Sequence, residues 1–143
     1  MADDILVVCI ANTCRSPIAD LLLQNALPHK NISSAGIKAI IGQPMNEHSA
    51  QLTSALGIEC ANHRARQLTQ EICQASQLIM VMEKCHIAAI LSIDPSAKHK
   101  IVLVGKWQDD IEIADPYGQN LEIYKNAFNL IQKSTDSWIE KLK

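Results

Sequence analysis

Short apolar runs alternate with helix-like segments along the chain, and few folds accommodate that order. Residues 5–8, 78–82 and 101–104 are apolar throughout, and residues 32–35 form a further strand candidate. A strand that is apolar at every position is buried on both faces, as in a parallel sheet covered by helices. Helical spacing of apolar residues predicts helices at 17–26, 46–56, 69–75, 84–91 and 121–142. The order predicts an α/β fold of three layers (αβα), a doubly wound, four-stranded parallel sheet with helices on both faces.

Length and composition narrow the class of protein. The 143 residues suit a single domain spanning 1–143, and 48% hydrophobic against 20% charged residues excludes a disordered tail. A net charge of −2 argues against a nucleic-acid partner. No apolar run approaches the roughly 20 residues that span a bilayer, so we expect no membrane insertion. The acidic start and the odd number of irregularly spaced cysteines, 5, argue against a signal peptide and a disulfide framework. We expect a cytoplasmic protein.

The loop after the first predicted strand carries groups that suit an anion. It reads Cys9-Ile10-Ala11-Asn12-Thr13-Cys14-Arg15-Ser16-Pro17. We expect Ser16 to cap the following helix and Pro17 to be its first residue. Free N–H groups at that helix start and the Arg15 guanidinium would bind a phosphate. Beneath it, Cys9 would be a thiolate placed for in-line attack on phosphorus.

Two other interpretations of this loop remain open. Cysteines at strand ends are often simply part of the core. A zinc site from Cys9 and Cys14 is weaker, because zinc-binding pairs are usually two to four residues apart and need two further ligands. Cys60, His63 and Cys85 could be invoked, but they form no second pair with that spacing.

A second motif, Asp115-Pro116-Tyr117-Gly118, follows the fourth predicted strand. One carboxyl group could protonate the leaving oxygen of a phosphate ester and then deprotonate water. Tyr117 could wall the pocket and stack on an aromatic substrate. The alternative is an ordinary turn, because Asp-Pro commonly opens turns. Asp94-Pro95 is interpreted as such a plain loop.

Together these motifs resemble the low-molecular-weight protein tyrosine phosphatases. The carriers are Cys9-x5-Arg15-Ser16-Pro17, Asp115-Pro116-Tyr117-Gly118, Ser34-Ala35-Gly36 and His63-Arg64-Ala65-Arg66-Gln67, which extend over nearly the whole chain. Met82-Glu83-Lys84-x-His86-Ile87 and Gly105-x-Trp107 look most like the bacterial branch that accompanies tyrosine autokinases in capsule and exopolysaccharide assembly. The resemblance implies a phosphotyrosine protein, such as one of these bacterial tyrosine autokinases, as substrate, phosphate as product, and no metal or cofactor.

The resemblance also implies roles for individual residues. Cys9 would be the nucleophile and form a phosphocysteine, Arg15 would clamp the phosphate, and Asp115 would be the general acid and then the base. Ser16 would assist the Cys9 sulfur, and Cys14 could form a protective disulfide with Cys9 on oxidation. Asn12, tied to Ser34 and His63, would hold the loop's shape. The substrate-binding set would be Ile10, Ala11, Asn12, Thr13, Cys14, Ser16, Ile40 and Tyr117.

The chain departs from the family pattern at two places. The family usually has Gly where Ala11 stands, and a positive φ there would cost on the order of 1 kcal/mol. With a negative φ the methyl group would only narrow the pocket. Where eukaryotic relatives place a Trp, this chain has Ile40 and Ile41, so Ile10 and Tyr117 would supply the remaining apolar contact.

Two further functions stay open at this point. A thioredoxin-coupled arsenate reductase shares the fold and anion loop but needs an additional cysteine pair, and Cys85 has no partner at the expected spacing because Leu78 and Ser92 stand there. A non-catalytic phosphotyrosine-binding module would retain the anion loop without turnover.

Overall fold

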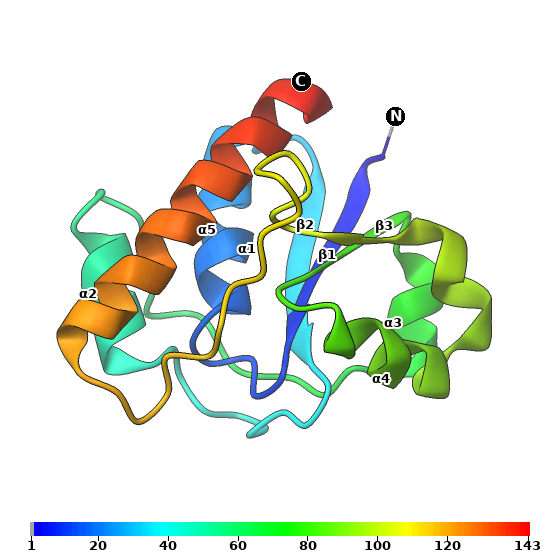
Figure 1. Cartoon of the computed structure of the whole chain (residues 1–143), viewed down its shortest axis with the longest axis horizontal. Coiled ribbons are helices and arrows are strands. Elements are labelled where there is room, and N and C mark those ends of the chain that lie inside the picture. The colour runs from blue at the N-terminus through cyan, green and yellow to red at the C-terminus, as the bar shows by residue number, and fades with distance from the viewer. Residues whose placement is uncertain (1) are drawn as a thin grey trace.

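The computed structural model describes residues 2–143 and contains a four-stranded parallel sheet in the order β2-β1-β3-β4 (Figure 1). The strands are β1 (Asp4–Cys9), β2 (Asn31–Gly36), β3 (Leu78–Val81) and β4 (Ile101–Leu103). Strand β1 lies at the centre, paired with β2 on one side and β3 on the other. All neighbouring strands pair in parallel, so the predicted α/β fold with a four-stranded parallel sheet is confirmed.

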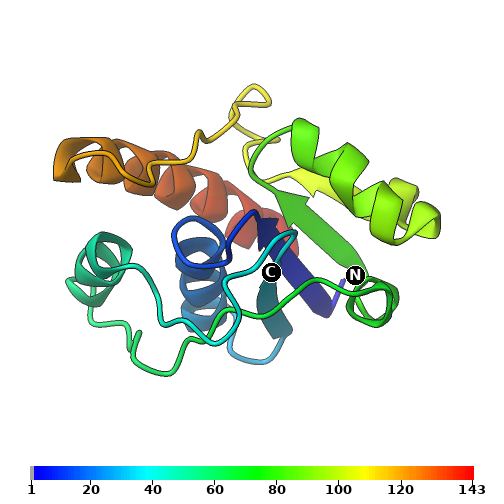
Figure 2. The same cartoon turned by 90° about the horizontal axis from the view of Figure 1, so that it is seen from below.

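Helices cover both faces of the sheet (Figures 1 and 2). They are α1 (Ser16–Ala26), α2 (Glu47–Ser54), α3 (Gln70–Ala75), α4 (Cys85–Ile93) and α5 (Leu121–Leu142). Alternate residues of β1 belong to different cores: Ile5 and Val7 pack with α1 and α5, whereas Leu6 and Val8 pack with α3 and α4. This alternation explains why β1 is apolar at successive positions.

The segment after α4 differs from its prediction as a plain loop. Residues Pro95–Lys100 form a 3-10 helix, and the buried Asp94 caps it by accepting a hydrogen bond from the backbone N–H of Ser96 at 3.1 Å. An acidic cap followed by proline is a signal for the start of a helix. The prediction of a plain loop was wrong because it overlooked this signal in Asp94-Pro95.

Because every neighbouring pair of strands is parallel, the carboxyl ends of all four strands lie at one edge of the sheet. The loop after β1, the segment after β2 and the segment before α5 lie together at the lower side in Figure 1. Such an edge is where open parallel sheets bind ligands.

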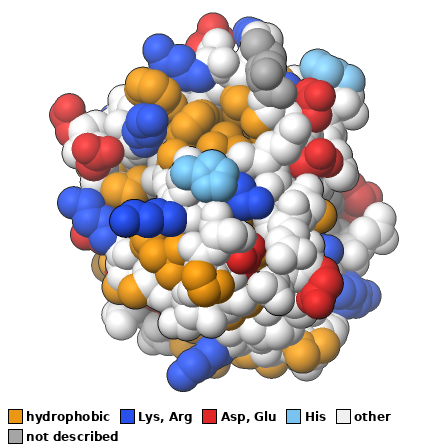
Figure 3. All heavy atoms as spheres, turned by 90° about the vertical axis from the view of Figure 1, so that its right-hand side faces the viewer, with side chains coloured by type: hydrophobic (Ala, Val, Ile, Leu, Met, Phe, Trp, Pro, Cys, Tyr) orange, Lys and Arg blue, Asp and Glu red, His pale blue; other side chains and the backbone are white. Residues whose placement is uncertain are grey.

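The side of the molecule formed by α3 and α4 carries acidic and basic side chains scattered among apolar ones (Figure 3). Within residues 2–143, no helix combines the length and apolarity needed to cross a membrane.

Candidate active site

The loop between β1 and α1 is held with its carbonyl groups turned outward. The carbonyl oxygens of Cys9 through Thr13 each accept a hydrogen bond from a neighbouring segment. The donors are the backbone N–H groups of Ile37, Lys38, Ile40 and Asn46 and the ring Nε2 of His63, at 2.8 to 3.2 Å. In a planar trans peptide the N–H points opposite to the C=O. The N–H groups of residues 10–14 therefore face the inside of the loop, where an anion would lie.

The close approach of the neighbouring segment depends on Gly36. A Cβ atom at this position would lie 2.5 Å from the carbonyl oxygen of Ile10. No other residue type fits without moving one backbone away from the other, so glycine at the end of β2 is needed for the bracing contacts.

Asn12 forms the tight bend of the loop. Its φ is +61°, and its amide Nδ2 donates to the hydroxyls of Ser16 at 2.8 Å and Ser34 at 3.0 Å. Its Oδ1 accepts from the backbone N–H of Arg66 at 3.0 Å, and the side chain is fully buried. Asparagine tolerates the left-handed conformation better than most residues. The hydrogen bonds compensate for burying the polar amide.

Ala11 is not among the residues with positive φ, so the methyl group causes no backbone strain there. The left-handed conformation falls one residue later, on Asn12. Of the two outcomes considered for Ala11, the structure therefore has the one in which the methyl group only narrows the pocket.

We expect Asn12→Ala to destabilise the fold by about 2–4 kcal/mol, because it leaves buried partners unpaired and places alanine in the left-handed region. Asn12→Gly is the matched control: it loses the same hydrogen bonds without the conformational penalty. Urea unfolding should therefore find the glycine variant more stable than the alanine variant by about 1 kcal/mol. Equal stabilities would contradict the conformational part of the argument.

The Cys9 sulfur lies at the bottom of the loop, at the end of β1. Its Sγ is 2.9 Å from the Ser16 hydroxyl and accepts from the Ser16 backbone N–H at 3.4 Å. Because the Ser16 oxygen already accepts from Asn12, the single hydroxyl proton of Ser16 is free to point at the sulfur. These donors stabilise negative charge on the Cys9 sulfur.

The sequence predicted that Ser16 would cap α1, and the structure shows that it does not. The capping position is Arg15, which makes no side-chain cap hydrogen bond, and Ser16 is the first helical residue. Its hydroxyl is instead committed to Cys9 and Asn12. The prediction was wrong because a long-range contact uses the group that local propensity assigns to the cap.

The Arg15 guanidinium is almost completely buried beside the loop. Its Nη1 donates to the Glu83 carboxylate at 2.6 Å and to the Ile113 carbonyl at 2.7 Å. The buried Nε has no protein partner, and Nη2 is 3.8 Å from Asp115 Oδ2. The Nε and Nη2 edge is therefore available to bind two oxygens of an anion at the pocket.

Asp115 lines the same cavity as Cys9 and Arg15, and its side chain is exposed to solvent. Its Oδ1 accepts from the backbone N–H of Tyr117 at 3.1 Å, which fixes the carboxylate on the turn. Both Tyr117 and Ile40 are exposed and line the mouth. A solvent-exposed carboxyl group that lines the cavity can exchange protons with a substrate oxygen and with water.

These groups share a cavity of about 240 Å³. It is lined by Cys9, Ile10, Ala11, Thr13, Cys14, Arg15, Ile40, Asp115 and Tyr117. The side chains of Asn12, Ser16, Ser34 and His63 do not line the cavity; their hydrogen bonds connect the loop to β2 and to the 63–67 segment. Asn12 and Ser16 were predicted to bind substrate, whereas their buried side chains support the loop from behind.

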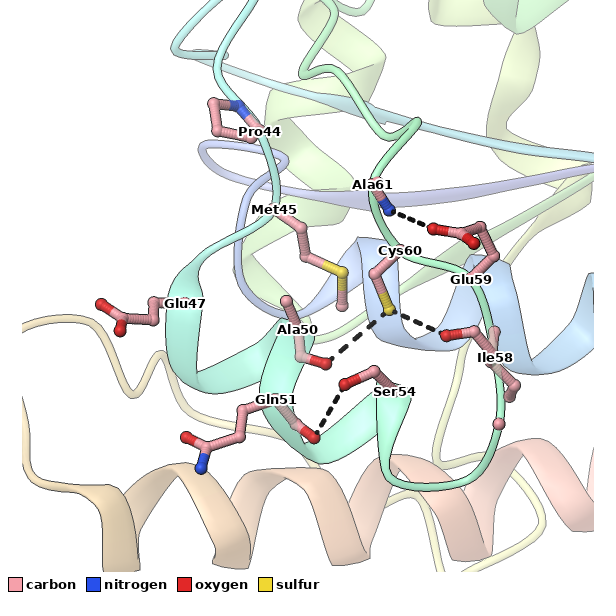
Figure 4. A pocket seen from close by; sticks show the side chains of 11 residues that line it. Pro44, Met45, Glu47, Ala50, Gln51, Ser54, Ile58, Glu59, Cys60 and Ala61 are labelled. Carbon is pink, nitrogen blue, oxygen red and sulfur yellow. Dashed lines mark hydrogen bonds between the residues drawn. The ribbon is translucent and has the colours of Figure 1, made fainter.

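A larger and more open hollow of about 750 Å³ lies elsewhere, between α2 and residues 57–61 (Figure 4). Its charged residues are Glu47 and Glu59, which repel anions. Its Cys60 thiol is hydrogen-bonded to the carbonyl oxygens of Ala50 and Ile58, as Figure 4 shows, and burial raises its pKa. The chemistry therefore favours the smaller cavity.

Sequence reasoning gave no role to Glu83 or Tyr124. Glu83 is the charge partner of Arg15, and the Tyr124 hydroxyl lies 3.8 Å from the buried Cys14 sulfur. Burial raises the pKa of Tyr124 to about 12 and also raises the pKa of Cys14. In the sequence, Glu83 stood out only as part of a segment that resembles the family. No neighbouring residue indicated that Tyr124 would contact the site.

Among residues 2–143, the side chains able to form a metal cluster are Glu83, Cys85 and His86. Cys9 and Cys14, weighed above as a weaker zinc alternative, are not part of that cluster. Cys9 is instead directed at Ser16, and Cys14 at Thr13 and Tyr124.

Comparison with known proteins identifies one family over nearly the whole chain. The family model for low molecular weight phosphotyrosine protein phosphatases matches residues 4–143. The probable low molecular weight protein-tyrosine-phosphatase AmsI of Erwinia amylovora is 39% identical over 99% of each chain. The structure of Vibrio vulnificus Wzb in complex with benzylphosphonate superposes with a TM-score of 0.95, at 38% identity over 99% of each chain.

A further solved structure is that of YwlE, an arginine phosphatase from Geobacillus stearothermophilus. It matches with a TM-score of 0.90 and 36% identity, covering 96% of this chain and 91% of that one. The family model and the relatives above cover nearly all of this chain. The chain belongs to the low molecular weight phosphotyrosine protein phosphatases.

Proposed function

We propose that this phosphatase hydrolyses phosphotyrosine in proteins through a phosphocysteine intermediate on Cys9. The observation that carries the proposal is the cavity in which the Cys9 sulfur, the buried Arg15 guanidinium and the Asp115 carboxyl group converge. The inward N–H groups of the loop supply the remaining donors for the phosphoryl oxygens.

In the first step the Cys9 thiolate attacks phosphorus and the bond from phosphorus to the tyrosine oxygen breaks. The Asp115 carboxyl group gives its proton to that oxygen, so tyrosine leaves as a neutral phenol. Arg15 and the loop N–H groups bind the equatorial oxygens, where they stabilise the charge of the transition state.

In the second step a water molecule attacks phosphorus and gives a proton to the Asp115 carboxylate. The sulfur–phosphorus bond breaks, inorganic phosphate is released and the thiolate returns. The Ser16 hydroxyl, 2.9 Å from Sγ, stabilises the departing sulfur by donating a hydrogen bond to it. No step draws on a metal or cofactor.

The shape of the cavity favours an aryl phosphate. The reactive sulfur is buried, whereas the apolar Ile40 and Tyr117 side chains stand at the exposed mouth. We expect the longer phosphotyrosine side chain to bring its phosphorus to the sulfur with its ring between these residues, and the shorter phosphoserine side chain to fall short of it. The Vibrio relative binds benzylphosphonate, which carries its phosphonate group on a benzyl group.

The decisive experiment compares peptides containing phosphotyrosine, phosphoserine or phosphoarginine, with EDTA present. We expect kcat/KM for phosphotyrosine to exceed that for phosphoserine by at least about a hundredfold, because the short side chain cannot bring phosphorus to the sulfur. Phosphate release measures each reaction. Comparable turnover of phosphoserine would contradict the pocket argument, and activity that vanishes with EDTA would contradict the mechanism.

Phosphoarginine hydrolysis is the second candidate, because the arginine phosphatase YwlE shares this fold at 36% identity. The exposed apolar mouth favours an aromatic ring over a guanidinium group, which would need hydrogen-bond acceptors. Higher kcat/KM for phosphoarginine than for phosphotyrosine would reverse this ranking. Arsenate-dependent oxidation of thioredoxin would instead support a reductase, and tight phosphopeptide binding without turnover a binding module.

We further propose that the protein substrate is a bacterial tyrosine autokinase of the capsule and exopolysaccharide systems, and that this phosphatase acts on it in the cytoplasm. The family-like segment around Glu83 and His86 supports the branch assignment. The free cysteines support a reducing compartment, since all of them, including the nucleophile, are unpaired thiols.

A further inference from the structure

The buried Arg15 guanidinium depends on Glu83 for its charge balance and its orientation. Arg15 is 1% exposed, whereas the Glu83 side chain is 28% exposed. The Nη1 atom of Arg15 is occupied by Glu83 Oε2 at 2.6 Å and by the Ile113 carbonyl oxygen at 2.7 Å. A buried charge without these partners would be strongly unfavourable, so the position of the Glu83 carboxylate decides where the guanidinium lies.

His86, in the first turn of α4, fixes the other side of that carboxylate. Its buried Nδ1 accepts a hydrogen bond from the Glu83 backbone N–H at 3.3 Å. A neutral imidazole carries one proton, so an accepting Nδ1 places that proton on Nε2. Nε2 forms no hydrogen bond within residues 2–143, but it lies 3.3 Å from Glu83 Oε2, the same oxygen that binds Arg15, so its N–H acts on the carboxylate as a close polar contact.

The environment of His86 keeps the imidazole neutral. Burial lowers the pKa of His86, and the Arg15 charge lowers it further, against the opposing effect of the carboxylates of Glu83, Asp115 and Glu112. The tautomer with hydrogen on Nε2 is therefore the form present at neutral pH.

We propose that His86 is a positioning residue: its Nε2–H orients the Glu83 carboxylate, which holds Arg15 with its Nε and Nη2 edge toward the phosphoryl group. The inference rests on the phosphate-binding role proposed above for Arg15. Arrangements in which an outer residue orients a ligating residue commonly change affinity by about tenfold or more when they are broken.

The same geometry disfavours a metal site at Glu83, Cys85 and His86, although their ligand atoms lie within 4.8 Å of one another. A metal on Nε2 would move the imidazole proton to Nδ1. That proton would then face the Glu83 backbone N–H, so two donors would oppose each other.

The test compares His86→Leu, which removes the donor, with His86→Gln, whose amide can replace the Nε2–H. The inhibition constant for inorganic phosphate and kcat for a phosphotyrosine peptide are measured. We expect His86→Leu to weaken phosphate binding and lower kcat by about tenfold each, and His86→Gln to stay within about threefold of the parent. Values for His86→Leu within about twofold of the parent, or a glutamine variant as impaired as the leucine variant, would overturn the proposal.

Ile90→Ala is the matched control for packing. Ile90 is fully buried on the same helix as His86 and packs in the core that α3 and α4 cover. It should lower stability in urea yet leave phosphate binding unchanged within about twofold. Phosphate binding weakened as much as in His86→Leu would show that general loosening of α4 is the cause, and the positioning role would fall.

A double-mutant cycle of His86→Leu with Glu83→Gln tests whether His86 acts on Arg15 through Glu83. If His86 acts through Glu83, the losses of the single variants in phosphate affinity will not add in the double variant; additive losses would contradict the proposal. Arg15→Lys distinguishes the phosphate-binding role of Arg15 from the positioning role of His86. A fully active Arg15→Lys would overturn the proposed function and the positioning role with it, whereas an inactive one beside an unaffected His86→Leu would overturn the positioning role alone.

Discussion

Cys9→Ser should lower kcat for phosphotyrosine peptides by about four orders of magnitude or more, while inorganic phosphate still binds. The hydroxyl that replaces the thiol is a poor nucleophile, since its proton is held far more tightly. The Arg15 guanidinium and the inward N–H groups, which bind the phosphate oxygens, stay in place. Steady-state kinetics give the first quantity, and calorimetric titration with phosphate gives the second.

Cys85→Ser is the control for this variant. Cys85 is an exposed thiol at the start of α4 and lies outside the cavity, so its loss should leave kcat within about twofold. A Cys9→Ser enzyme with one tenth of the parent activity would mean that the nucleophile has been misassigned. Loss of phosphate binding together with activity would instead show that the loop itself depends on the sulfur.

The parts of the site that could be predicted are those that lie close together in the sequence. Cys9, Arg15 and the start of α1 belong to one short segment, and local rules for strands, helix starts and anion loops apply within it. Asp115 could be singled out only together with that loop and the family resemblance, because an Asp-Pro sequence alone is as readily an ordinary turn.

Long-range contacts account for what the sequence could not reveal. Glu83 follows β3, which lies beside β1 in the sheet, and that order brings Glu83 to Arg15 across a sequence separation of 68 residues. The same reason explains the misassigned cap at Ser16, whose hydroxyl is taken by Cys9 and Asn12. Local propensity describes a side chain's preference in isolation, and tertiary partners change it.

Asp115→Asn should lower kcat for phosphotyrosine by about 10²–10³-fold, because the amide can neither protonate the tyrosine oxygen nor accept a proton from water. The loss should depend on the leaving group. Nitrophenolate is a weak base that departs without a proton, whereas the tyrosine oxygen, with a pKa of about 10, needs one. Formation of the phosphocysteine from nitrophenyl phosphate should therefore be nearly unaffected.

Pre-steady-state kinetics isolate that step, because hydrolysis of the intermediate also loses its base and would slow every substrate equally. With Asp115→Asn, nitrophenyl phosphate should give a rapid burst of nitrophenol followed by slow turnover, while phosphotyrosine should give no burst. Asp110→Asn, an exposed acid on the preceding segment, should behave as the parent. Equal loss of the burst with both substrates would remove Asp115 from the proton-donor role, and since Asp115 lies 3.8 Å from Arg15 Nη2, its remaining function would be to orient that guanidinium.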